Sequence, residues 1–273
     1  MIGQKSLLTT LGVQIDNEVF PQFSILVGSE GSGRKTLARI ITQLLHANSV
    51  ICGVSADEIK SLTDMAVKVA DKTVYIIADA DNMSVNAINA LLKITEEPPK
   101  NAYFIMTIQD DYNVLSTIKS RGTIYRVESY SAEEVMQYAL SIKDYYTSEE
   151  TEIVTNICLT PGDVEKILKE DIIEFWEYVI KVIDNIGSVS IANSFKIADK
   201  IAFKDEEGKY NLKLFWRAFM LLCTEYMTLH LDDRVKYANW VRITSQYLQN
   251  LRITGLNKQA LFDGWVLEIR GNQ

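Results

Sequence analysis

The sequence predicts an α/β first half built on a parallel sheet and an all-helical second half. Short apolar runs at 23–27, 74–77, 103–107 and 124–127 alternate with segments whose apolar residues follow the helical period. Strands that alternate with helices form parallel sheets covered by helices on both faces. The first run leads into the glycine-rich turn GSEGSG and then into TLARIITQLL, which is the order strand, phosphate-type loop, helix.

A helix is predicted after the second apolar run, within DADNMSVNAINALLKI. Ile88, Leu91 and Leu92 have helical spacing. The sequence EEPP at 96–99 ends this helix, because proline lacks the N–H of the next backbone hydrogen bond and restricts the residue before it. A short helix, VLSTIKS, is expected between the third and fourth strands.

The pattern changes after Glu128. From Ser131 onward we predict helices and no strand, with glycines between the amphipathic segments. We expect an α/β domain over 1–128, a small helical domain over 129–170 and a helical bundle over 171–273. Large aromatic residues are frequent in the bundle, and most should lie in its core: Trp176, Trp216, Phe219, Tyr226, Tyr237, Trp240, Tyr247 and Trp265.

Composition narrows the class of protein. The chain has 273 residues, 28 basic and 36 acidic, for a net charge of −8. Because DNA-binding domains carry a basic face, this balance favours protein partners over autonomous DNA binding, although a local basic strip stays open. No apolar run reaches the ~20 residues of a membrane helix, and the start does not resemble a signal peptide. We expect a cytoplasmic protein.

The cysteines and histidines do not predict a metal site. Cys52, Cys158 and Cys223 lie far apart and form no CxxC pair, so neither a zinc ribbon nor a disulfide framework is supported. We expect buried free thiols. His46 and His230 are isolated and are expected to be structural.

The phosphate-type loop is degenerate. Gly28 and Gly33 have the spacing G-x-x-x-x-G, with Gly31 between them, which lets backbone N–H groups face a phosphate at a helix N-terminus. The motif then requires Lys and a Ser or Thr that binds Mg²⁺. Here Arg34 and Lys35 occupy these two positions.

Shifting the frame does not repair the loop. Thr36 is the nearest hydroxyl, but it lies one residue late, about 100° round the helix. With Lys35 and Thr36 as the functional pair, Ser29 and Arg34 stand where glycines belong. Two interpretations stay open: a glycine turn that only joins strand to helix, and residual nucleotide or anion binding.

Several motifs together resemble the bacterial clamp-loader subunits of the AAA+ family. They are GQ at 3–4, GSEGSGRKTLA, VYIIADADNMSVNAINALLKITEEPP and Ser120-Arg121-Gly122, where the family usually has Ser-Arg-Cys. The resemblance covers residues 1–128 by motif and the remainder only by its helical pattern. It implies an AAA+ domain, a helical lid and a C-terminal collar that joins subunits into a ring-like pentamer. Some collar aromatics are then interface anchors.

By this resemblance the second Walker motif is degenerate too. Active relatives end the strand in Asp-Glu, which supports the metal ion and positions the attacking water. Here Ala78 stands at the Asp position and Asp79 at the Glu position, with Asp81 two residues on. Asp79 and Asp81 could instead be carboxylates at the start of a helix. In the lid, Asp163 follows a Thr-Pro-Gly turn where relatives carry a phosphate-sensing basic residue.

Arg121 matches the arginine finger of the family, which reaches the ATP site of a neighbouring subunit and stabilises phosphate charge. Gly122 in place of cysteine should matter little. A degenerate site with a retained finger is typical of the delta-prime type of subunit. The four-cysteine zinc module of many relatives is missing from 46–73.

The resemblance therefore implies an ATPase-dead scaffold subunit that needs no cofactor and binds ATP or ADP weakly or not at all. Its expected partners are gamma/tau-type ATPase and delta-type subunits, with the sliding clamp and primer–template DNA reached through the assembled complex. Two alternatives stay open: a divergent active ATPase that uses Arg34 and Asp79, and an unrelated small-molecule kinase.

Overall fold

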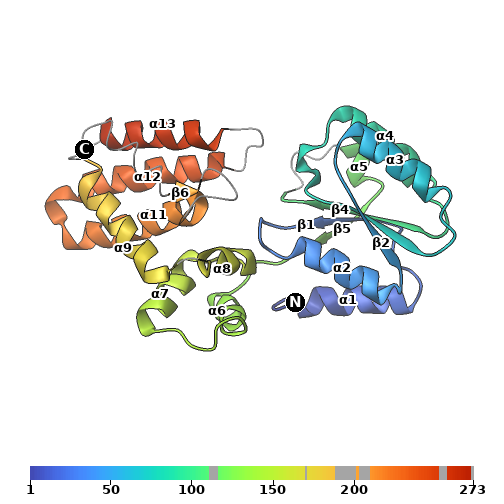
Figure 1. Cartoon of the computed structure of the whole chain (residues 1–273), viewed down its shortest axis with the longest axis horizontal. Coiled ribbons are helices and arrows are strands. Elements are labelled where there is room, and N and C mark those ends of the chain that lie inside the picture. Colours follow the sequence, from blue (N-terminus) through green and yellow to red (C-terminus); the bar gives the residue numbers. More distant parts are fainter. Residues whose placement is uncertain (111–115, 170, 188–200, 203–209, 252–256, 272–273) are drawn as a thin grey trace. The chain divides into compact units, whose positions relative to one another are not determined.

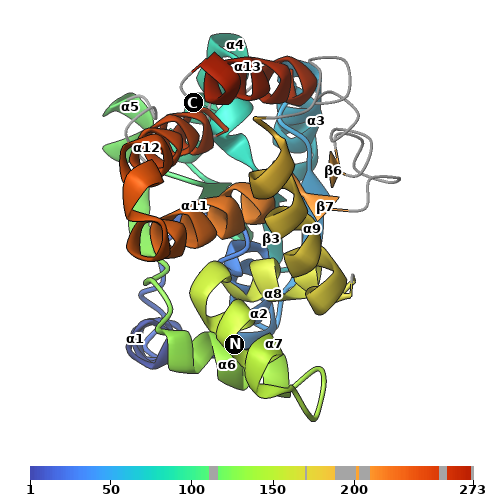
Figure 2. The same cartoon turned by 90° about the vertical axis from the view of Figure 1, so that its left-hand side faces the viewer.

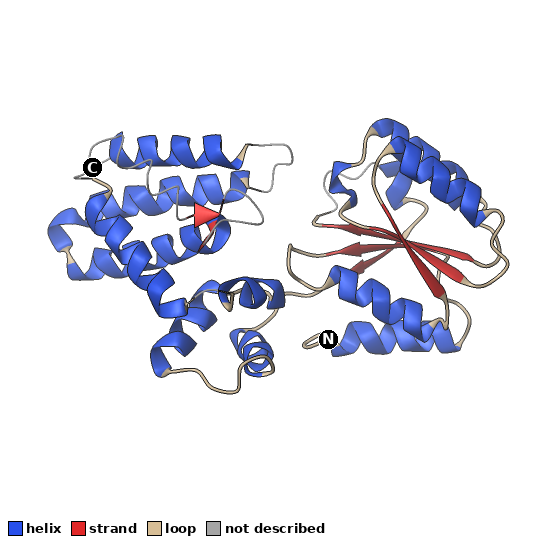
Figure 3. Cartoon of the chain, in the orientation of Figure 1, coloured by secondary structure: helices blue, strands red, loops and turns tan. Residues whose placement is uncertain are grey.

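The computed structural model describes residues 1–110, 116–169, 171–187, 201–202, 210–251 and 257–271. The chain divides into two compact units, Met1–Tyr130 and Ser131–Gln273, which are described separately. The first unit is α/β and the second is almost entirely helical (Figure 3). This architecture confirms the predicted fold class. The predicted border between a lid and a collar near residue 170 lies inside the second unit and stays a prediction.

The first unit is built on five parallel strands in the order β2-β3-β4-β1-β5. They are β1 (Phe23–Val27), β2 (Asn48–Cys52), β3 (Thr73–Ile77), β4 (Ala102–Ile108) and β5 (Thr123–Arg126). Four were predicted, and β2 was missed. It lies at the edge of the sheet and exposes Asn48, Ser49 and Ile51, so its sequence lacks the apolar run of a central strand.

Helices cover both faces of this sheet (Figure 1). On one face lie α1 (Lys5–Asp16) and α2 (Arg34–Leu44); on the other lie α3 (Ala56–Ala66), α4 (Val85–Glu96) and α5 (Ser116–Lys119). Successive residues of β1 serve the two faces: Ile25 packs with α3 and α4, and Leu26 with α1 and α2. The central strands of a doubly covered sheet are therefore buried along their whole length, as Phe23–Val27 is.

The second unit begins with α6 (Ala132–Leu140), α7 (Ser148–Ile157) and α8 (Pro161–Ile167), and continues with α9 (Ile172–Asn185), α11 (Leu212–Leu229), α12 (Arg234–Asn250) and α13 (Lys258–Gly271). Short 3-10 helices, η1 (Ala80–Asn82) and η3 (Leu231–Asp233), belong to the first and second unit respectively. The expectation of no strand after Ser131 is wrong in one detail, because β6 (Ile201–Ala202) and β7 (Tyr210–Asn211) form a parallel pair.

Aromatic side chains fill the core of the second unit, where α11, α12 and α13 stack in turn (Figure 2). Trp216, Trp240 and Trp265 are fully buried. The indole N–H of Trp265 donates to Thr244 Oγ1 at 2.9 Å, and that of Trp240 donates to the carbonyl of Ile269 at 3.0 Å. These bonds satisfy two polar groups that burial would otherwise leave without water.

Across the described residues, no helix is both long enough and apolar enough to cross a membrane.

Candidate functional site

The phosphate-type loop connects β1 to α2 through glycines in left-handed conformations. Gly31 has φ +80°, and Gly33, the N-cap of α2, has φ +90°. Side chains with a Cβ rarely adopt such angles, so the turn needs glycine at both positions. Gly28 donates its N–H to the carbonyl of Ile108 at the end of β4. The loop is further held by Tyr130, whose hydroxyl donates to the carbonyl of Ser32 at 2.7 Å.

The two cations after the loop are paired with carboxylates of the same chain. Arg34 is only 7% exposed, and its guanidinium lies 3.6 Å from Asp79 Oδ1 and 3.9 Å from Asp81 Oδ2. Lys35 Nζ lies 2.6 Å from Asp79 Oδ2, at a more exposed position. Burial lowers the pKa of Arg34, and the charges of Asp79, Asp81 and Glu30 oppose that shift. The positive charge expected to face a phosphate is thus largely compensated inside the chain.

The carboxylates themselves are anchored by the end of β4. Asp79 has φ +53°, a left-handed conformation that aspartate tolerates better than most residues. Its N–H donates to Thr107 Oγ1 at 3.0 Å, and Asp81 Oδ1 accepts from the N–H of Gln109 at 2.7 Å. Thr107 and Gln109 were not singled out from the sequence. The available signal was that the carboxyl ends of neighbouring parallel strands meet at one edge of a sheet.

Asp79 and Asp81 lie at the start of the short helix η1, as the helix-start interpretation expected, and not in the first turn of α4. That helix begins at Val85, and its N-cap is Ser84, whose hydroxyl accepts from the N–H of Ala87 at 3.2 Å. Asp79 directly precedes η1 and Asp81 lies within it. They are drawn to Arg34 because that guanidinium is buried beside them and needs a counter-charge.

The side chains around the loop lack most of the groups that bind Mg²⁺ and a nucleotide phosphate in active relatives. Thr36 is exposed in the first turn of α2, and Ala78 offers only a methyl group after β3. Three buried atoms, Ser32 Oγ, Arg34 NH1 and Asp81 Oδ2, make no hydrogen bond within the described residues. The side chains around the loop therefore do not supply the usual hydroxyl and carboxylate for a bound Mg²⁺.

Arg121 lies away from this cluster, directly after α5. Its guanidinium donates to Glu96 Oε1 at 2.6 Å and to the carbonyl of Thr117 at 2.8 Å. The arginine side chain is 31% exposed and that of Glu96 is 52% exposed. Within the described part of the chain its polar contacts are confined to α4 and α5. The guanidinium is thus held at the surface of the first unit in a defined orientation.

The space around Gly122 is tighter than expected from the sequence, where glycine in place of cysteine should matter little. A Cβ at this position would lie 2.8 Å from the side chain of Ile25 and 3.0 Å from that of Phe23, both in β1. Such distances are shorter than carbon–carbon contacts allow. The cysteine that is usual in the family would require this part of the core to shift, so glycine is a packing requirement here.

Asp163 is a buried structural charge. It is 1% exposed; Oδ2 accepts from Arg217 at 2.6 Å and from the N–H of Leu159, and Oδ1 accepts from Lys213 at 3.1 Å. Burial acts to raise its pKa, but Lys213 and Arg217 together hold the pKa below its usual range. The expected repulsion of phosphate overlooked these two cations, which come from α11 and could not be located from the sequence.

The three cysteines are free and buried, as predicted. Burial raises the pKa of Cys52 to about 11 and that of Cys158 to about 12, which keeps both thiols protonated. No cluster of three or more His, Cys, Asp or Glu side chains among the described residues has a geometry that could hold a metal ion.

Comparison with known proteins identifies relatives for much of the chain. Residues 53–131 match the family described as DNA polymerase III, delta subunit. The gamma subunit of DNA polymerase III from Buchnera aphidicola is 22% identical over 250 residues, covering 76% of this chain and 68% of that protein. The delta-prime subunit from Buchnera aphidicola is 24% identical, and this chain covers 55% of its length. The delta-prime subunit from Haemophilus influenzae is 28% identical, and this chain covers 36% of its length.

Solved structures share the fold. A DNA polymerase III gamma subunit-related protein from Thermotoga maritima has a TM-score of 0.52 at 15% identity, covering 97% of this chain and 99% of that chain. A RuvB mutant from Thermotoga maritima has a TM-score of 0.55 at 15% identity, with 97% and 89% covered. The motifs, the AAA+ fold and the sequence matches together support a subunit of the DNA polymerase III clamp-loader family.

Proposed function

We propose that this chain is an ATPase-dead scaffold subunit of the delta-prime type, which supplies Arg121 to the ATP site of a neighbouring clamp-loader subunit. The observation that carries the proposal is the ion-pair cluster beside the phosphate-type loop. Arg34 and Lys35, the residues that should meet a nucleotide, are engaged by Asp79 and Asp81.

Hydrolysis needs more than an anion-binding loop. A phosphoryl group is transferred only when a metal ion and positioned charges stabilise its transition state. In this chain the metal-supporting position is Ala78, and the nearest loop hydroxyl, Thr36, is exposed. Phosphate entry would also have to compete with Asp79 for Lys35, at a distance of 2.6 Å. Binding of ATP or ADP is therefore expected to be weak or absent, and no cofactor is required.

The surroundings of Arg121 support a role in trans. Its bond to Glu96 joins two partly exposed groups, and such surface pairs contribute about 0–1 kcal/mol. Little free energy is therefore lost when Arg121 leaves Glu96 and binds the phosphates of a neighbouring nucleotide instead. The second bond, to the carbonyl of Thr117, holds the guanidinium beside α5.

The partners follow from this role. Gamma/tau-type ATPase subunits would receive the finger, and a delta-type subunit would complete the assembly. The sliding clamp and primer–template DNA would be reached through the complex, in agreement with the net charge of −8. Such a subunit would work in the cytoplasm, with the replication machinery.

Two ATPase assays test the proposal. The isolated chain should show no Mg²⁺-dependent hydrolysis above background. A complex reconstituted with Arg121→Ala should hydrolyse ATP at least about tenfold more slowly than wild type, because arginine fingers contribute factors of 10³ or more where they are fully engaged. Arg39→Ala removes an exposed arginine on α2 and serves as the matched control. Robust turnover by the isolated chain, or equal rates for the two variant complexes, contradicts the proposal.

A divergent active ATPase is the second candidate, favoured by the contact between Lys35 and Asp79 at the mouth of the loop. If Asp79 positions water or a metal ion, hydrolysis by the isolated chain must be measurable and must disappear in Asp79→Ala. The scaffold proposal expects no hydrolysis in either protein, so one experiment separates the two functions.

A further inference from the structure

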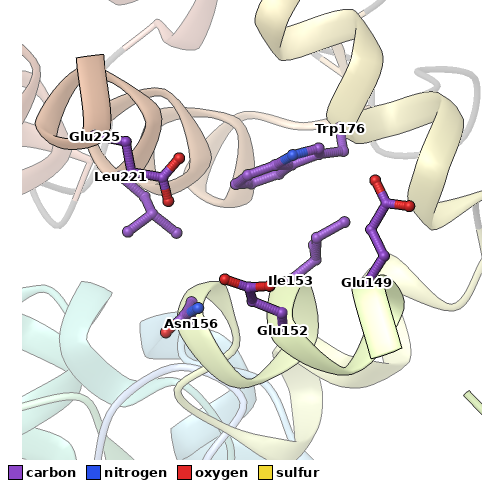
Figure 4. Close-up of a pocket in the computed structure, with 7 residues that line it drawn as sticks. All are labelled: Glu149, Glu152, Ile153, Asn156, Trp176, Leu221 and Glu225. Carbon is purple, nitrogen blue, oxygen red and sulfur yellow. The ribbon is translucent and has the colours of Figure 1, made fainter. Parts of the chain in front are cut away.

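The second unit contains a small pocket that none of the motifs includes. It has a volume of about 190 Å³ and lies between α7, α9 and α11. Its lining combines one aromatic ring, apolar side chains and carboxylates (Figure 4). The ring is Trp176 of α9; α7 contributes Glu149, Glu152 and Ile153, and α11 contributes Leu221 and Glu225.

Trp176 distinguishes this pocket from a merely acidic surface. The other three tryptophans are fully buried in the core, whereas Trp176 is half-buried and forms one side of the pocket. Figure 4 shows its indole opposite the side chains of α7, with Glu225 on a further side. The face of an indole carries negative electrostatic potential and attracts cations. Ile153 and Leu221 add apolar surface that suits the stem of a long side chain.

The carboxylates of the pocket lack a paired cation among the described residues. Glu149, Glu152 and Glu225 make no ion pair with any described residue, whereas the neighbouring Glu150 is bound by Lys143 at 2.7 Å. The position of Glu149 in the first turn of α7 can be explained by the helix dipole, but Glu152 and Glu225 lie outside first turns. Burial and the charge of Glu152 raise the pKa of Glu225. A cation in the pocket would relieve this repulsion.

The geometry selects the kind of cation. These carboxylates do not converge closely enough to hold a metal ion. A volume of about 190 Å³ is below the ~300–1,000 Å³ of ordinary small-molecule sites, and phosphate groups would be repelled. A guanidinium is planar, stacks on aromatic faces and carries five donors that can reach carboxylates on different sides. We propose that this pocket binds the side chain of an arginine presented by a partner protein.

This site is independent of the phosphate-type loop and of Arg121, so the inference does not rest on the proposed function. It can be tested on the full chain with blocked tripeptides, Gly-Arg-Gly, Gly-Lys-Gly and Gly-citrulline-Gly, at constant ionic strength. Citrulline keeps the shape of arginine and lacks its charge. Tryptophan emission is the readout, and Trp176→Phe identifies the part of the signal that comes from the pocket.

We expect a saturable change in Trp176 emission with the arginine peptide, weaker binding of the lysine peptide and none of the citrulline peptide. Glu152→Gln and Glu225→Gln should each weaken arginine binding about threefold or more, in line with the modest strength of exposed charge pairs. Glu133→Gln, an exposed glutamate on α6, should not. Equal binding of arginine and citrulline, equal binding of arginine and lysine, no saturable binding, or unchanged affinity in both pocket variants overturns the proposal.

Discussion

Replacing Asp163 with asparagine should destabilise the second unit strongly. Asp163 of α8 is 1% exposed and bonded to two cations of α11, Lys213 and Arg217, which are 19% and 15% exposed. Arg217 also donates to the carbonyl of Ile157 at 3.2 Å, so the cluster ties α11 to the end of α7 as well. Asparagine preserves the size of the side chain, removes its charge and replaces one acceptor oxygen with an N–H₂ group that would face the donors around it.

The magnitude follows from the burial of the three charges. Removing one partner of a buried ion pair costs about 3–5 kcal/mol, because the remaining charge stays in a poorly solvated place. Lys213 and Arg217 retain some access to water, which favours the low end of the range. We expect a loss of about 3 kcal/mol. With a urea slope of about 2 kcal/mol per M, the unfolding midpoint should fall by about 1.5 M.

Tryptophan fluorescence measures this loss selectively. All four tryptophans lie between residues 131 and 273, so their emission reports unfolding of the second unit alone. Circular dichroism, which detects both units, provides the comparison. Asp171→Asn is a poorer control because Asp171 caps α9, whereas the exposed Glu133 makes Glu133→Gln suitable.

A cycle of variants separates charge pairing from simple loss of contacts. Lys213→Met/Arg217→Met leaves the buried Asp163 without a cation and should be at least as damaging as Asp163→Asn. The triple variant removes all three charges and should be less destabilised than the sum by about 2 kcal/mol or more. Additive losses, or a loss below about 1 kcal/mol for Asp163→Asn, would refute the reasoning.

The same cluster predicts an acid dependence. Lys213 and Arg217 hold the pKa of folded Asp163 below the value of about 3.9 that an unfolded chain has. Its contribution is therefore complete above about pH 5 and is lost as pH falls through the unfolded value towards the folded one. The stability difference between wild type and Asp163→Asn should shrink on acidification, and a constant difference would contradict the assignment.

Three further outcomes follow from the first unit and the thiols. Gly122→Ala should destabilise the first unit by about 1–3 kcal/mol, seen by circular dichroism, because its Cβ would meet Ile25 at 2.8 Å; an unchanged melting curve would show that the core yields freely. Asp79→Asn should release Lys35 and increase the affinity for a fluorescent ATP analogue several-fold without creating hydrolysis, and unaltered affinity would mean that this ion pair does not limit binding. Cys158, with a pKa raised to about 12, should react with a thiol reagent at pH 8 only after unfolding, and rapid labelling of the native protein would be inconsistent with its burial.

Local patterns in the sequence were sufficient for most of the fold. The largely apolar runs of β1, β3 and β4 reflect a parallel sheet that is covered on both faces, and this pattern is visible in one dimension. The edge strand β5 was found from a shorter run, IYRV. The glycines of the loop and the prolines after α4 affect the backbone conformation at or next to their own positions. The turn and the end of the helix could therefore also be predicted from the sequence. An edge strand such as β2 carries neither signal, since its exposed face tolerates polar residues.

The sequence by itself determined which charged residues this chain has and which motif positions it lacks; only the tertiary structure decided which charges meet. Arg34 and Asp79 are 45 residues apart, and Asp163 and Arg217 are 54 apart, yet each pair is in contact. The physical reason is that ion pairs are selected by burial and by the meeting of strand ends and helix faces, neither of which has a fixed spacing along the chain. Thus Ala78, at the position where relatives carry aspartate, predicted a degenerate site from the sequence, whereas the ion pairs of Arg34 and Lys35 with Asp79 became apparent only in the folded structure.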